Sequence, residues 1–570
     1  MTASAAEDHG EDHARLAVGH AQLEVEQVLQ PRAEILPPSR DYRSARTEGR
    51  GEVSLWRPRL TSADTSTLRD APTLRARARD LVRNDPLASN AVRMNRDSVS
   101  GSGLKLSLSI DWRTLGIADI EAASEWQDHV TRMWEAYAEG TDHAADARRQ
   151  LTFSQLFRIA DSSDYVDGEA LAVVEMKPSL LGYQTCLSLV DVDRLSTPDG
   201  VLESTGMRAG IERDVYGEPI AYHIREQHPA DWSLSLTLSQ FRWKRVPRAT
   251  PWGRPIVLHS FDHHRPEMTR GVTEFASVIA SMKMLQRYQE TELESAIAQA
   301  SIAAVIKSEL DWSSAMQVLG AKAGGTGNAL SDMVAGHMVN AAEYAKRREL
   351  TFNGVQIPHL LPNEELSITK PTHPNGNFAN FESAFVRHLA AGLGVEAHEL
   401  GKNYREVNYS SARAALHAVW RTYLSRRLRL VQQIAMPFFG AWLEEAVWLG
   451  TVPLPKGVGD FQAAKPFLVR GTFLAWGRPM IDPMKERQAQ QLGIQMGAET
   501  LEEIAAETGK NWRDLVDQAA YERAYYRKAG VPHPADILPA AVAPQGADAG
   551  SEDDSNSGGR GNAAPAGTSA

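Results

Sequence analysis

The 570-residue sequence contains a single cysteine, Cys186. One thiol excludes a disulfide framework within the chain and a zinc site built from cysteines, and it fits a reducing compartment. Cys186 lies in a short stretch that is typical of a β-strand. We therefore expect a buried structural thiol rather than a catalytic one.

Long apolar runs are also missing from the sequence. No stretch reaches the roughly eighteen apolar residues that a membrane-spanning helix needs. The amino terminus lacks the basic and apolar pattern of a signal peptide. We therefore expect a protein that does not enter a membrane and that is soluble and intracellular when it is made.

Two motifs of catalytic chemistry are absent from the sequence as well. The Gly-x-x-x-x-Gly-Lys-Ser/Thr spacing that holds a triphosphate does not occur, and the glycine-rich stretch 320–327 does not supply it. There is no Gly-x-Ser-x-Gly nucleophile elbow, although the sequence leaves a Ser–Lys arrangement open. We expect no catalytic residues and no cofactor.

Positive charge is in the minority, with 61 Lys and Arg against 72 Asp and Glu, a formal net charge of −11. A protein that grips nucleic acid along its whole length is expected to be basic. The acidic balance is compatible with a surface that DNA passes without adhering. With 42% apolar and 23% charged residues, most of the chain should be globular, in two to four domains.

Two histidine-containing clusters were considered as metal sites. Residues 8–13 are rich in Asp, Glu and His, but they lie in a polar stretch that we expect to be a solvated tail. His259, His263 and His264 could share a helical face, but Arg265-Pro266 follows immediately and disfavours a helix. We expect no metal site.

The chain is organised around residues 378–447, which are typical of a helix, a polar segment and a long second helix. Apolar residues spaced three and four apart mark the first helix, up to Leu393. The polar segment 396–409 carries two basic and three acidic residues and is not easily buried. Ser410-Ser411 are good N-cap residues for the second helix, and Pro437 should kink it.

The rest of the sequence predicts an α+β, helix-rich fold. Helices are expected at 74–96 with a break at Pro86, at 119–138 after Asp119, and after the capping box Thr152-x-x-Gln155. Strands are expected at 170–175 and 186–190, a hairpin at 211–224, and a long helix at 272–304. The 74–96 helix is rich in arginine. Its surface could bind nucleic acid, but without interleaved aromatics we favour a solvated or subunit-facing surface. These arginines are Arg75, Arg77, Arg79, Arg83, Arg93 and Arg96.

Five ordered segments resemble the lambda-type family of bacteriophage portal proteins. Glu-Val-Asn-Tyr-Ser-Ser-Ala-Arg at 406–413 resembles the family's "NYSS-x-R" signature, and 377–395 resembles the run before it. Residues 77–86, 257–272 and 481–489 resemble further family motifs. The family has an acidic residue shortly before the signature, where Asn403 stands here.

The resemblance implies a portal-type fold with a wing, stem helices, a clip and a C-terminal helical, crown-like region. The expected boundaries are a disordered arm at 1–41, an α+β wing region at 42–271, stem helices at 272–305 and 372–395, a clip at 306–371, a channel loop at 396–411, a long kinked wing helix at 412–450, a C-terminal helical region at 451–533 and a disordered tail at 534–570.

The resemblance also implies a function. The family forms a homo-oligomeric ring of about twelve subunits at one capsid vertex, through which double-stranded genome DNA passes without sequence specificity during packaging and ejection. Implied partners are the large terminase, the head–tail adaptor, the scaffold and the major capsid protein. The implied location is the virion, with the host cytoplasm during assembly. The alternatives are a capsid-associated enzyme (a maturation protease or packaging ATPase) and a shell-forming capsid protein.

Two sets of residues are the candidate sites. The first is the channel loop, which the resemblance places in the DNA channel: Glu399, Lys402, Asn403, Arg405, Glu406, Asn408 and Tyr409. The second is a row of arginines on the following helix that could face phosphate or a neighbouring subunit, or could be solvated: Arg413, Arg421, Arg426, Arg427 and Arg429.

Overall fold

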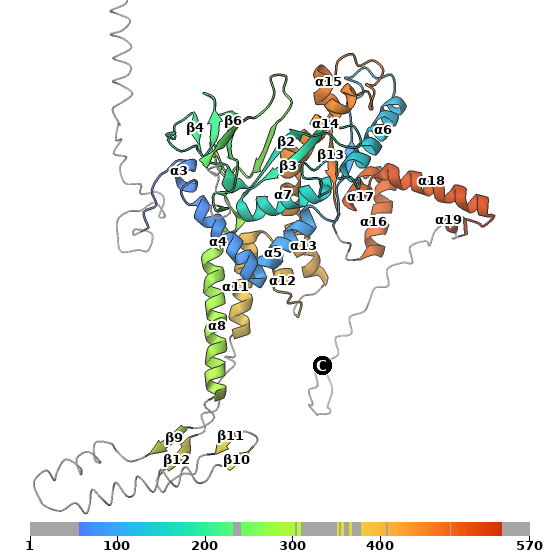
Figure 1. Cartoon of the computed structure of the whole chain (residues 1–570). Coiled ribbons are helices and arrows are strands. Elements are labelled where there is room, and N and C mark those ends of the chain that lie inside the picture. Colours follow the sequence, from blue (N-terminus) through green and yellow to red (C-terminus); the bar gives the residue numbers. More distant parts are fainter. Residues whose placement is uncertain are drawn as a thin grey trace, which may run out of the picture. The chain divides into compact units, whose positions relative to one another are not determined.

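The structure is a computed structural model that describes residues 56–231, 241–301, 305–308, 350–352, 355–357, 364–367, 378–405, 409–478, 480 and 482–537. The chain divides into two units, Met1–Ser66 and Thr67–Ala570. Of the first unit the structure describes residues 56–66, which include the start of helix α3 (Ala63–Thr67). The second unit contains all the features below (Figure 1).

Helices α4 (Ala71–Asn84) and α5 (Pro86–Val99) confirm the break predicted at Pro86. Asp85 between them is extended, as expected for a residue before proline. Its carboxylate accepts hydrogen bonds from the N–H groups of Leu87 and Ala88, both at 2.9 Å, and so caps α5.

Helices α6 (Ile120–Ala138) and α7 (Phe153–Asp167) also begin at the predicted caps. The Asp119 carboxylate accepts from the Ala122 N–H at 2.7 Å. Thr152 and Gln155 form both halves of a capping box, which satisfies two backbone donors that helix geometry leaves free.

Two antiparallel sheets follow α7. In the first, β2 (Glu169–Met176) lies between β3 (Thr185–Val190) and β8 (Val257–Phe261). The second has the order β4 (Met207–Arg208), β5 (Ile211–Arg213), β6 (Pro219–Arg225) and β7 (Trp243–Pro247). The predicted strands and hairpin are therefore confirmed, as is the buried position of Cys186. Strand β1 (Lys105–Leu108) pairs separately with β13 (Gly471–Leu474).

A cluster of aromatic rings forms the centre of the main core. The ring of Trp134 on α6 lies 5.2 Å, centroid to centroid, from those of Phe153 and Trp442 and 5.3 Å from that of Phe439. Most of these contacts are edge-to-face, the geometry that ring quadrupoles favour. Because these residues come from distant parts of the sequence, the cluster ties the first and last thirds of the unit together.

Helices α8 (Ile279–Ser301) and α11 (Phe378–Leu393) lie within the segments 272–305 and 372–395, for which stem helices were predicted, and they pack against each other. The ring of Tyr288 lies 4.8 Å from that of Phe381, and Gln289 donates to Glu382 at 2.7 Å. A 3-10 turn, η5 (Glu274–Ser277), precedes α8, so the predicted helix is not continuous from Val272.

Four short strands are described between α8 and α11. Strand β9 (Val305–Ser308) pairs with β12 (Glu364–Ser367), and β10 (Leu350–Phe352) pairs with β11 (Val355–Ile357). The glycine-rich stretch 320–327 and most of the predicted clip lie outside the described residues.

The long helix after the polar segment comprises α13 (Tyr409–Leu430), a π-helical turn η6 (Val431–Ala435) and α14 (Met436–Trp448). The Met436 N–H bonds to the carbonyl of Val431, five residues earlier, as a π turn requires. Pro437 lacks an N–H and lies in the first turn of α14, immediately after this widened turn. The irregularity predicted at Pro437 is thus a π turn on its N-terminal side.

The C-terminal region contains α15 (Phe461–Leu468), α16 (Pro483–Gln495), α17 (Leu501–Glu507), α18 (Trp512–Ala529) and α19 (Pro534–Ile537). Helix α19 occupies positions where the sequence predicted a disordered tail, so that prediction is wrong at 534–537. Between residues 482 and 537, the described side chains that are buried are Glu486, Ile504 and Ala505. In the described part of the chain, no helix is long and apolar enough to cross a membrane.

Candidate functional site

The predicted channel loop starts from a fixed base at the end of α11. Gly394 ends that helix with φ +64°, a conformation that L residues rarely adopt. Glu396 then accepts a hydrogen bond from the Glu399 N–H at 2.7 Å and caps a short helix, α12 (Ala397–Leu400). The first part of the polar segment is therefore helical rather than a loop.

This base packs against α5. The side-chain amide of Asn90 donates to the carbonyls of Glu399 and Leu400, both at 3.0 Å, and Leu400 is 1% exposed. The expectation that the polar segment is not easily buried is wrong at Leu400, whereas residues 396–399 stay partly exposed. One leucine and two backbone carbonyls are enough to fix the short helix to the core.

The tip of the segment, residues 401–405, is exposed throughout. Lys402, at φ +50°, and Arg405 are its charged residues. The carboxylates of Glu396 and Glu399 belong to the base instead. The base of the segment is thus acidic, and its tip is basic. Glu406 and Asn408 lie outside the described residues, and Tyr409 is the first residue of α13.

The five candidate arginines of the long helix divide into two groups. Arg413 and Arg421 are exposed. Arg426 and Arg427 are buried, and Arg429 forms ion pairs with Asp164 and, at 2.7 Å, with Asp262. The prediction that these last three are solvated or face phosphate or a neighbouring subunit is wrong, because each makes hydrogen bonds or ion pairs within its own chain.

The buried arginines fix the long helix to α5 and to the end of α11. Arg426 donates to Asn95 at 3.0 Å and to the carbonyl of Leu393 at 3.2 Å. Arg427 donates to the carbonyls of Val99 and Ser98 at 2.8 and 2.7 Å. The base of the polar segment and the C-terminal turns of α13 are therefore both anchored on the same helix, α5.

Two buried carboxylates on α7 also contribute to the contacts between α5, α7 and the long helix. Asp161 accepts from Asn95 at 2.9 Å and from Ser100 at 2.6 Å, and Asp164 pairs with Arg429. Burial raises the pKa of Asp161 to about 7 and that of Asp164 to about 6, because removal from water disfavours the charged form more than these partners favour it.

The raised pKa of Asp161 predicts a pH-dependent effect of the variant Asp161→Asn. A carboxyl whose pKa is higher in the folded than in the unfolded chain loses stabilising free energy as pH rises toward the folded value. The asparagine does not titrate, so its stability relative to the parent should improve by about 2 kcal/mol between pH 5 and pH 8. Urea unfolding of both proteins at the two pH values measures this, and a difference that does not change with pH would contradict it.

A second buried network connects the two sheets to α4. Glu169, fully buried at the start of β2, accepts from Arg270 at 2.5 Å, from Arg75 at 2.7 Å and from His259 at 2.9 Å. Burial raises the pKa of Glu169, but the charges and hydrogen bonds of Arg270 and His259 together outweigh that effect and hold the pKa well below its usual range. Arg75 is therefore neither solvated nor available to nucleic acid, whereas Arg77, Arg83 and Arg93 of the same predicted set are exposed.

A close backbone approach supports this network. Gly168 and Gly271 flank Glu169 and Arg270 in the sequence. A Cβ atom on Gly271 would lie 1.9 Å from the Gly168 carbonyl oxygen, and one on Gly168 would lie 2.2 Å from the carbonyl carbon of Val272. Neither position can accept a side chain, so both glycines are required for the two backbones to meet.

One group of side chains in the described residues has the spacing of a metal site. Ligand atoms of Asp191, Asp193 and His228 lie within 4.8 Å of one another. Arg79, however, donates to Asp193 at 2.6 Å and to Asp191 at 3.3 Å. The group is thus an ion-pair cluster that fixes α4. His259, one of the histidines considered from sequence, lies on strand β8 and is bonded to Glu169.

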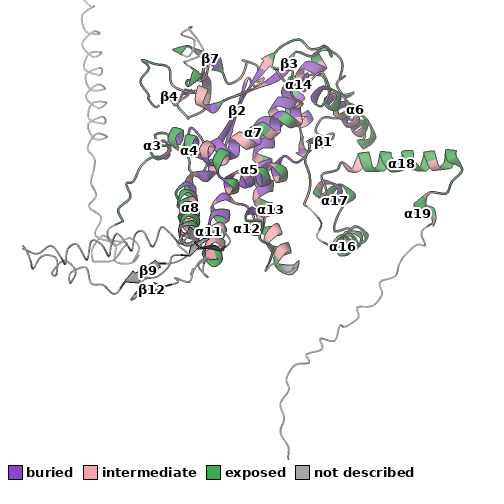
Figure 2. Cartoon of the chain, turned by 60° about the horizontal axis from the view of Figure 1, so that its bottom comes forward, coloured by how far each residue is buried: buried purple, intermediate pink, exposed green. Residues whose placement is uncertain are grey.

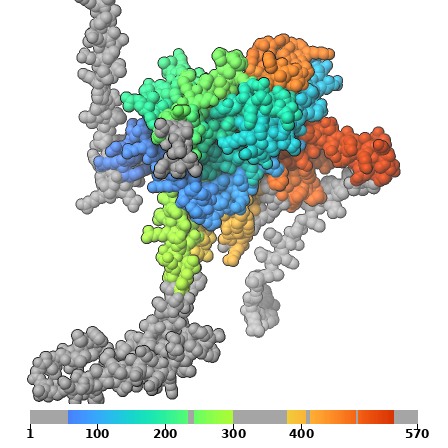
Figure 3. All heavy atoms as spheres, viewed as in Figure 1, coloured from blue at the N-terminus to red at the C-terminus, as the bar shows by residue number. Residues whose placement is uncertain are grey.

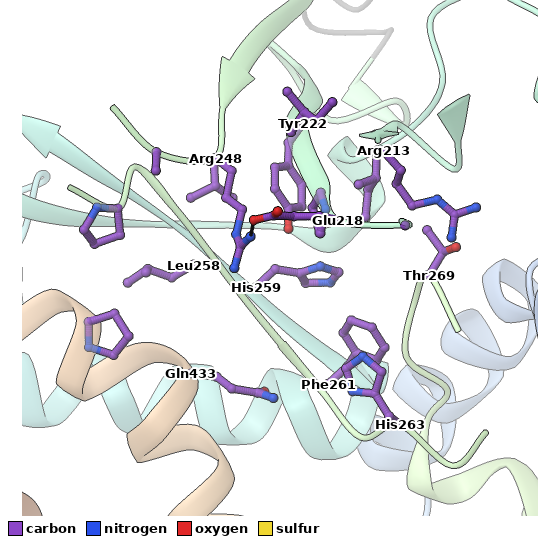
Figure 4. A pocket seen from close by; sticks show the side chains of 18 of the residues that line it. Arg213, Glu218, Tyr222, Arg248, Leu258, His259, Phe261, His263, Thr269 and Gln433 are labelled. Carbon is purple, nitrogen blue, oxygen red and sulfur yellow. Dashed lines mark hydrogen bonds and ion pairs between the residues drawn. The ribbon is translucent and has the colours of Figure 1, made fainter. Parts of the chain in front are cut away.

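A cavity of about 900 Å³ lies between β6, β8 and the π turn (Figure 4). Its lining includes Tyr222, His259, His263 and Gln433. The ring of His263 stacks on that of Phe261 at 4.1 Å, and His259 is bonded to Glu169. His259 and His263 thus already contact neighbouring side chains, one through a hydrogen bond and the other through ring stacking.

The fold is of the helix-rich α+β class, and comparison with known proteins gives the family. A helix-rich α+β chain presents an exposed basic tip on a rigid helical base. The model of the family "Phage portal protein, lambda family" matches residues 49–427, about two thirds of the sequence. The chain belongs to this family of phage portal proteins, which are structural proteins rather than enzymes.

Two relatives with similar sequences agree with this assignment. The chain is 32% identical to the portal protein of Escherichia phage N15 over 487 residues, 85% of this chain and 90% of the relative. It is 32% identical to portal protein B of Escherichia phage lambda over 489 residues, with the same coverage. A chain from the neck of a native gene transfer agent particle, computed with C12 symmetry, aligns over 78% of this chain and 94% of its own at 13% identity and a TM-score of 0.38.

Sequence reasoning missed the buried polar residues that anchor the base of the polar segment and the following long helix. Asn90, Asn95 and Asp161 are polar residues within helices, and no local pattern distinguishes them from solvated side chains. For Asn90 and Asn95, the useful signal is that helical residues three and four apart share a face, and they lie beside the apolar residues Ala91 and Met94. A polar residue on such a face must find a buried partner.

Proposed function

We propose that this chain assembles into a closed ring of about twelve copies at one capsid vertex, with a central channel for double-stranded DNA during packaging and ejection. The observation that carries the proposal is the 32% identity to two phage portal proteins over 85% of the chain. The geometry of the channel segment is compatible with it, because a fixed base presents an exposed tip that a ring would repeat around its axis.

The tip then acts on DNA without binding it tightly. Lys402 and Arg405 supply positive charge near phosphates, and the exposed Arg413 and Arg421 on α13 extend the basic surface. Glu399 and the other base carboxylate limit the net attraction. Asn403, Glu406, Asn408 and Tyr409 would complete the contact surface. A ring of weakly attractive tips can contact the duplex and oppose its backsliding while it still moves.

The ring's outer surfaces would serve assembly. We propose docking first of the large terminase and then of the head–tail adaptor, with contacts to scaffold and major capsid protein as the head forms in the host cytoplasm. The predicted clip, 306–371, is the region assigned to external partners.

Ring formation is directly measurable. One chain has a mass of 62.6 kDa, so a ring of about twelve should scatter light as a particle of roughly 750 kDa. Negative-stain images should show closed rings of one size. A monomer mass at all micromolar concentrations would contradict the proposal, and an extended lattice would favour a shell-forming capsid protein instead.

The enzyme alternative has its own test. A packaging ATPase or a maturation protease would hydrolyse ATP or a peptide substrate with the purified rings alone. We expect neither activity above background.

A further inference from the structure

Helices α8 and α11 are buried at one end of the pair only, as far as the described residues show. Figure 3 shows α8 projecting away from α4 and α5, and Figure 2 shows its outer part as exposed or partly exposed. The buried residues of α8 lie in its first two turns, and those of α11 lie in its last two. They are Ile279, Met282 and Leu285 in α8, and Leu389, Ala390 and Leu393 in α11. The orientation of the pair therefore depends on the contacts made at this end.

Arg426 on α13 lies at this end and contacts the end of α11 and the turn that precedes α8. Its guanidinium donates to the carbonyl of Leu393 at 3.2 Å and pairs with Glu274 of η5 at 3.1 Å. A third bond, to the side chain of Asn95 at 3.0 Å, reaches α5. Arg426 is 7% exposed, and the planar guanidinium, with several donors in fixed directions, suits such a junction. One side chain thus connects the α8–α11 pair to α5 and α13.

Tyr165 makes the same connection from α7. Its hydroxyl donates to the Leu393 carbonyl at 3.0 Å, and its ring lies edge-on to that of Phe275 in η5, 5.6 Å centroid to centroid. The Arg426 guanidinium lies 4.9 Å from the centre of the Tyr165 ring, within the range of a cation–π contact. Arg426 and Tyr165 therefore form one buried unit that contacts both the end of α11 and the turn before α8.

The attached ends of the two helices pack closely against this unit and against each other. A Cβ atom on Gly392 would lie 2.4 Å from Cγ1 of Val278, the residue before α8, and one on Gly394 would lie 3.1 Å from Nη2 of Arg426. From Gly394 the chain leads directly into α12, the base that carries the exposed tip at 401–405. Because the tip is exposed throughout, its position is set by this base, which continues from the end of α11.

We propose that Arg426 and Tyr165 are positioning residues, which hold the α8–α11 pair and the base of the polar segment in one orientation on α5, α7 and α13. Neither residue needs to touch DNA in this role. They fix the place at which the tip, with Lys402 and Arg405, is presented. The consequence for DNA rests on the proposed channel, whereas the coupling of the two segments is a property of the single chain.

Hydrogen exchange of the purified protein tests this coupling in the variant Arg426→Gln. Two sets of hydrogen-bonded amides report on it, those of Ala276 and Val278 at η5 and those of Leu400 and Gly401 at α12. We expect exchange in both sets to rise by at least about tenfold, because opening of either segment no longer has to break the bonds of the guanidinium. Exchange in α14 should not change.

Arg427→Gln is the matched control, because it removes the neighbouring buried arginine. Arg427 donates to the carbonyls of Ser98, Val99 and Trp476, none of which belongs to η5, α8, α11 or α12. Its replacement should leave exchange in the two sets within about twofold of the parent. An equal rise in both variants would overturn the proposal, because it would show a general loosening of α13. A rise confined to one of the two sets would overturn it as well.

Tyr165→Phe keeps the proposal testable if Arg426→Gln does not fold. The phenylalanine retains the ring contacts and loses only the hydroxyl bond to Leu393, so we expect a smaller rise, about threefold, in the same two sets of amides. Unchanged exchange in both sets would overturn the proposal.

Head assembly separates this proposal from the proposed function. The ratio of DNA-filled to empty heads should fall several-fold with Arg426→Gln and stay close to the parent ratio with Arg427→Gln. Equal ratios for the two variants would overturn the positioning role. Absence of rings in the parent protein would overturn the proposed function, and the exchange result would still decide whether Arg426 and Tyr165 couple the two segments.

Discussion

Replacing Glu169 with glutamine is expected to destabilise the chain by about 3–5 kcal/mol, because breaking a buried ion pair leaves an uncompensated charge. Arg270 and Arg75 both lie against the Glu169 carboxylate and are themselves buried. Urea unfolding at pH 7 measures the loss. Because the pKa of Glu169 is depressed, its stabilising contribution is present at neutral pH and is lost only as pH falls below the usual carboxyl range.

Glu212→Gln is the matched control for this prediction. Glu212 also pairs with an arginine and a histidine, Arg245 and His223, but Arg245 is half exposed. Solvent screens that pair, so we expect a loss of at most about 1 kcal/mol. If the two glutamine variants unfold at the same urea concentration, the Glu169 network does not hold the sheets to α4 as the geometry indicates.

Replacing residues 402–405 by a Gly/Ser sequence is expected to leave ring assembly intact and to remove most of the DNA-filled heads. All four side chains are exposed, so no core contact is lost. The replacement removes both basic residues of the described tip. The measurement is the ratio of filled to empty heads assembled with the variant. Heads that fill and retain DNA as well as the parent would show that the tip has no role in the channel.

Leu400→Ala provides the contrast on the base of the same segment. The side chain is buried, so its truncation should cost about 2–5 kcal/mol of stability. A variant of the base should therefore fail in folding or assembly, whereas a variant of the tip should fail only with DNA. Similar behaviour of both variants would mean that the segment is not divided into base and tip.

Local signals in the sequence were sufficient for most elements. Asp85-Pro86, Asp119 and the Thr152–Gln155 box each determine a helix start through backbone hydrogen bonds to nearby side chains, so they could be read without knowledge of the tertiary structure. The short, mostly apolar runs at 170–175 and 186–190 likewise predicted β2 and β3. The domain boundaries inferred from the family resemblance stay predictions.

Which charged side chains are buried could not be predicted from local sequence in the same way. Arg421 and Arg427 look alike along the sequence of α13, yet one is exposed and the other is buried against the carbonyls of Ser98 and Val99. Which arginine is buried depends on how α13 crosses α5, a contact between residues more than 300 positions apart. Leu400 was missed for the same reason, since one apolar residue in a polar segment has no periodicity.

The position of residue 402 in the assembled ring tests the account most directly. In the variant Lys402→Cys the exposed thiol can be labelled with a gold cluster, because Cys186 is buried. Averaged end-on images should place the gold density at the centre of a closed ring. Gold at the outer edge, or labelled particles that are not rings, would contradict a channel formed around this segment.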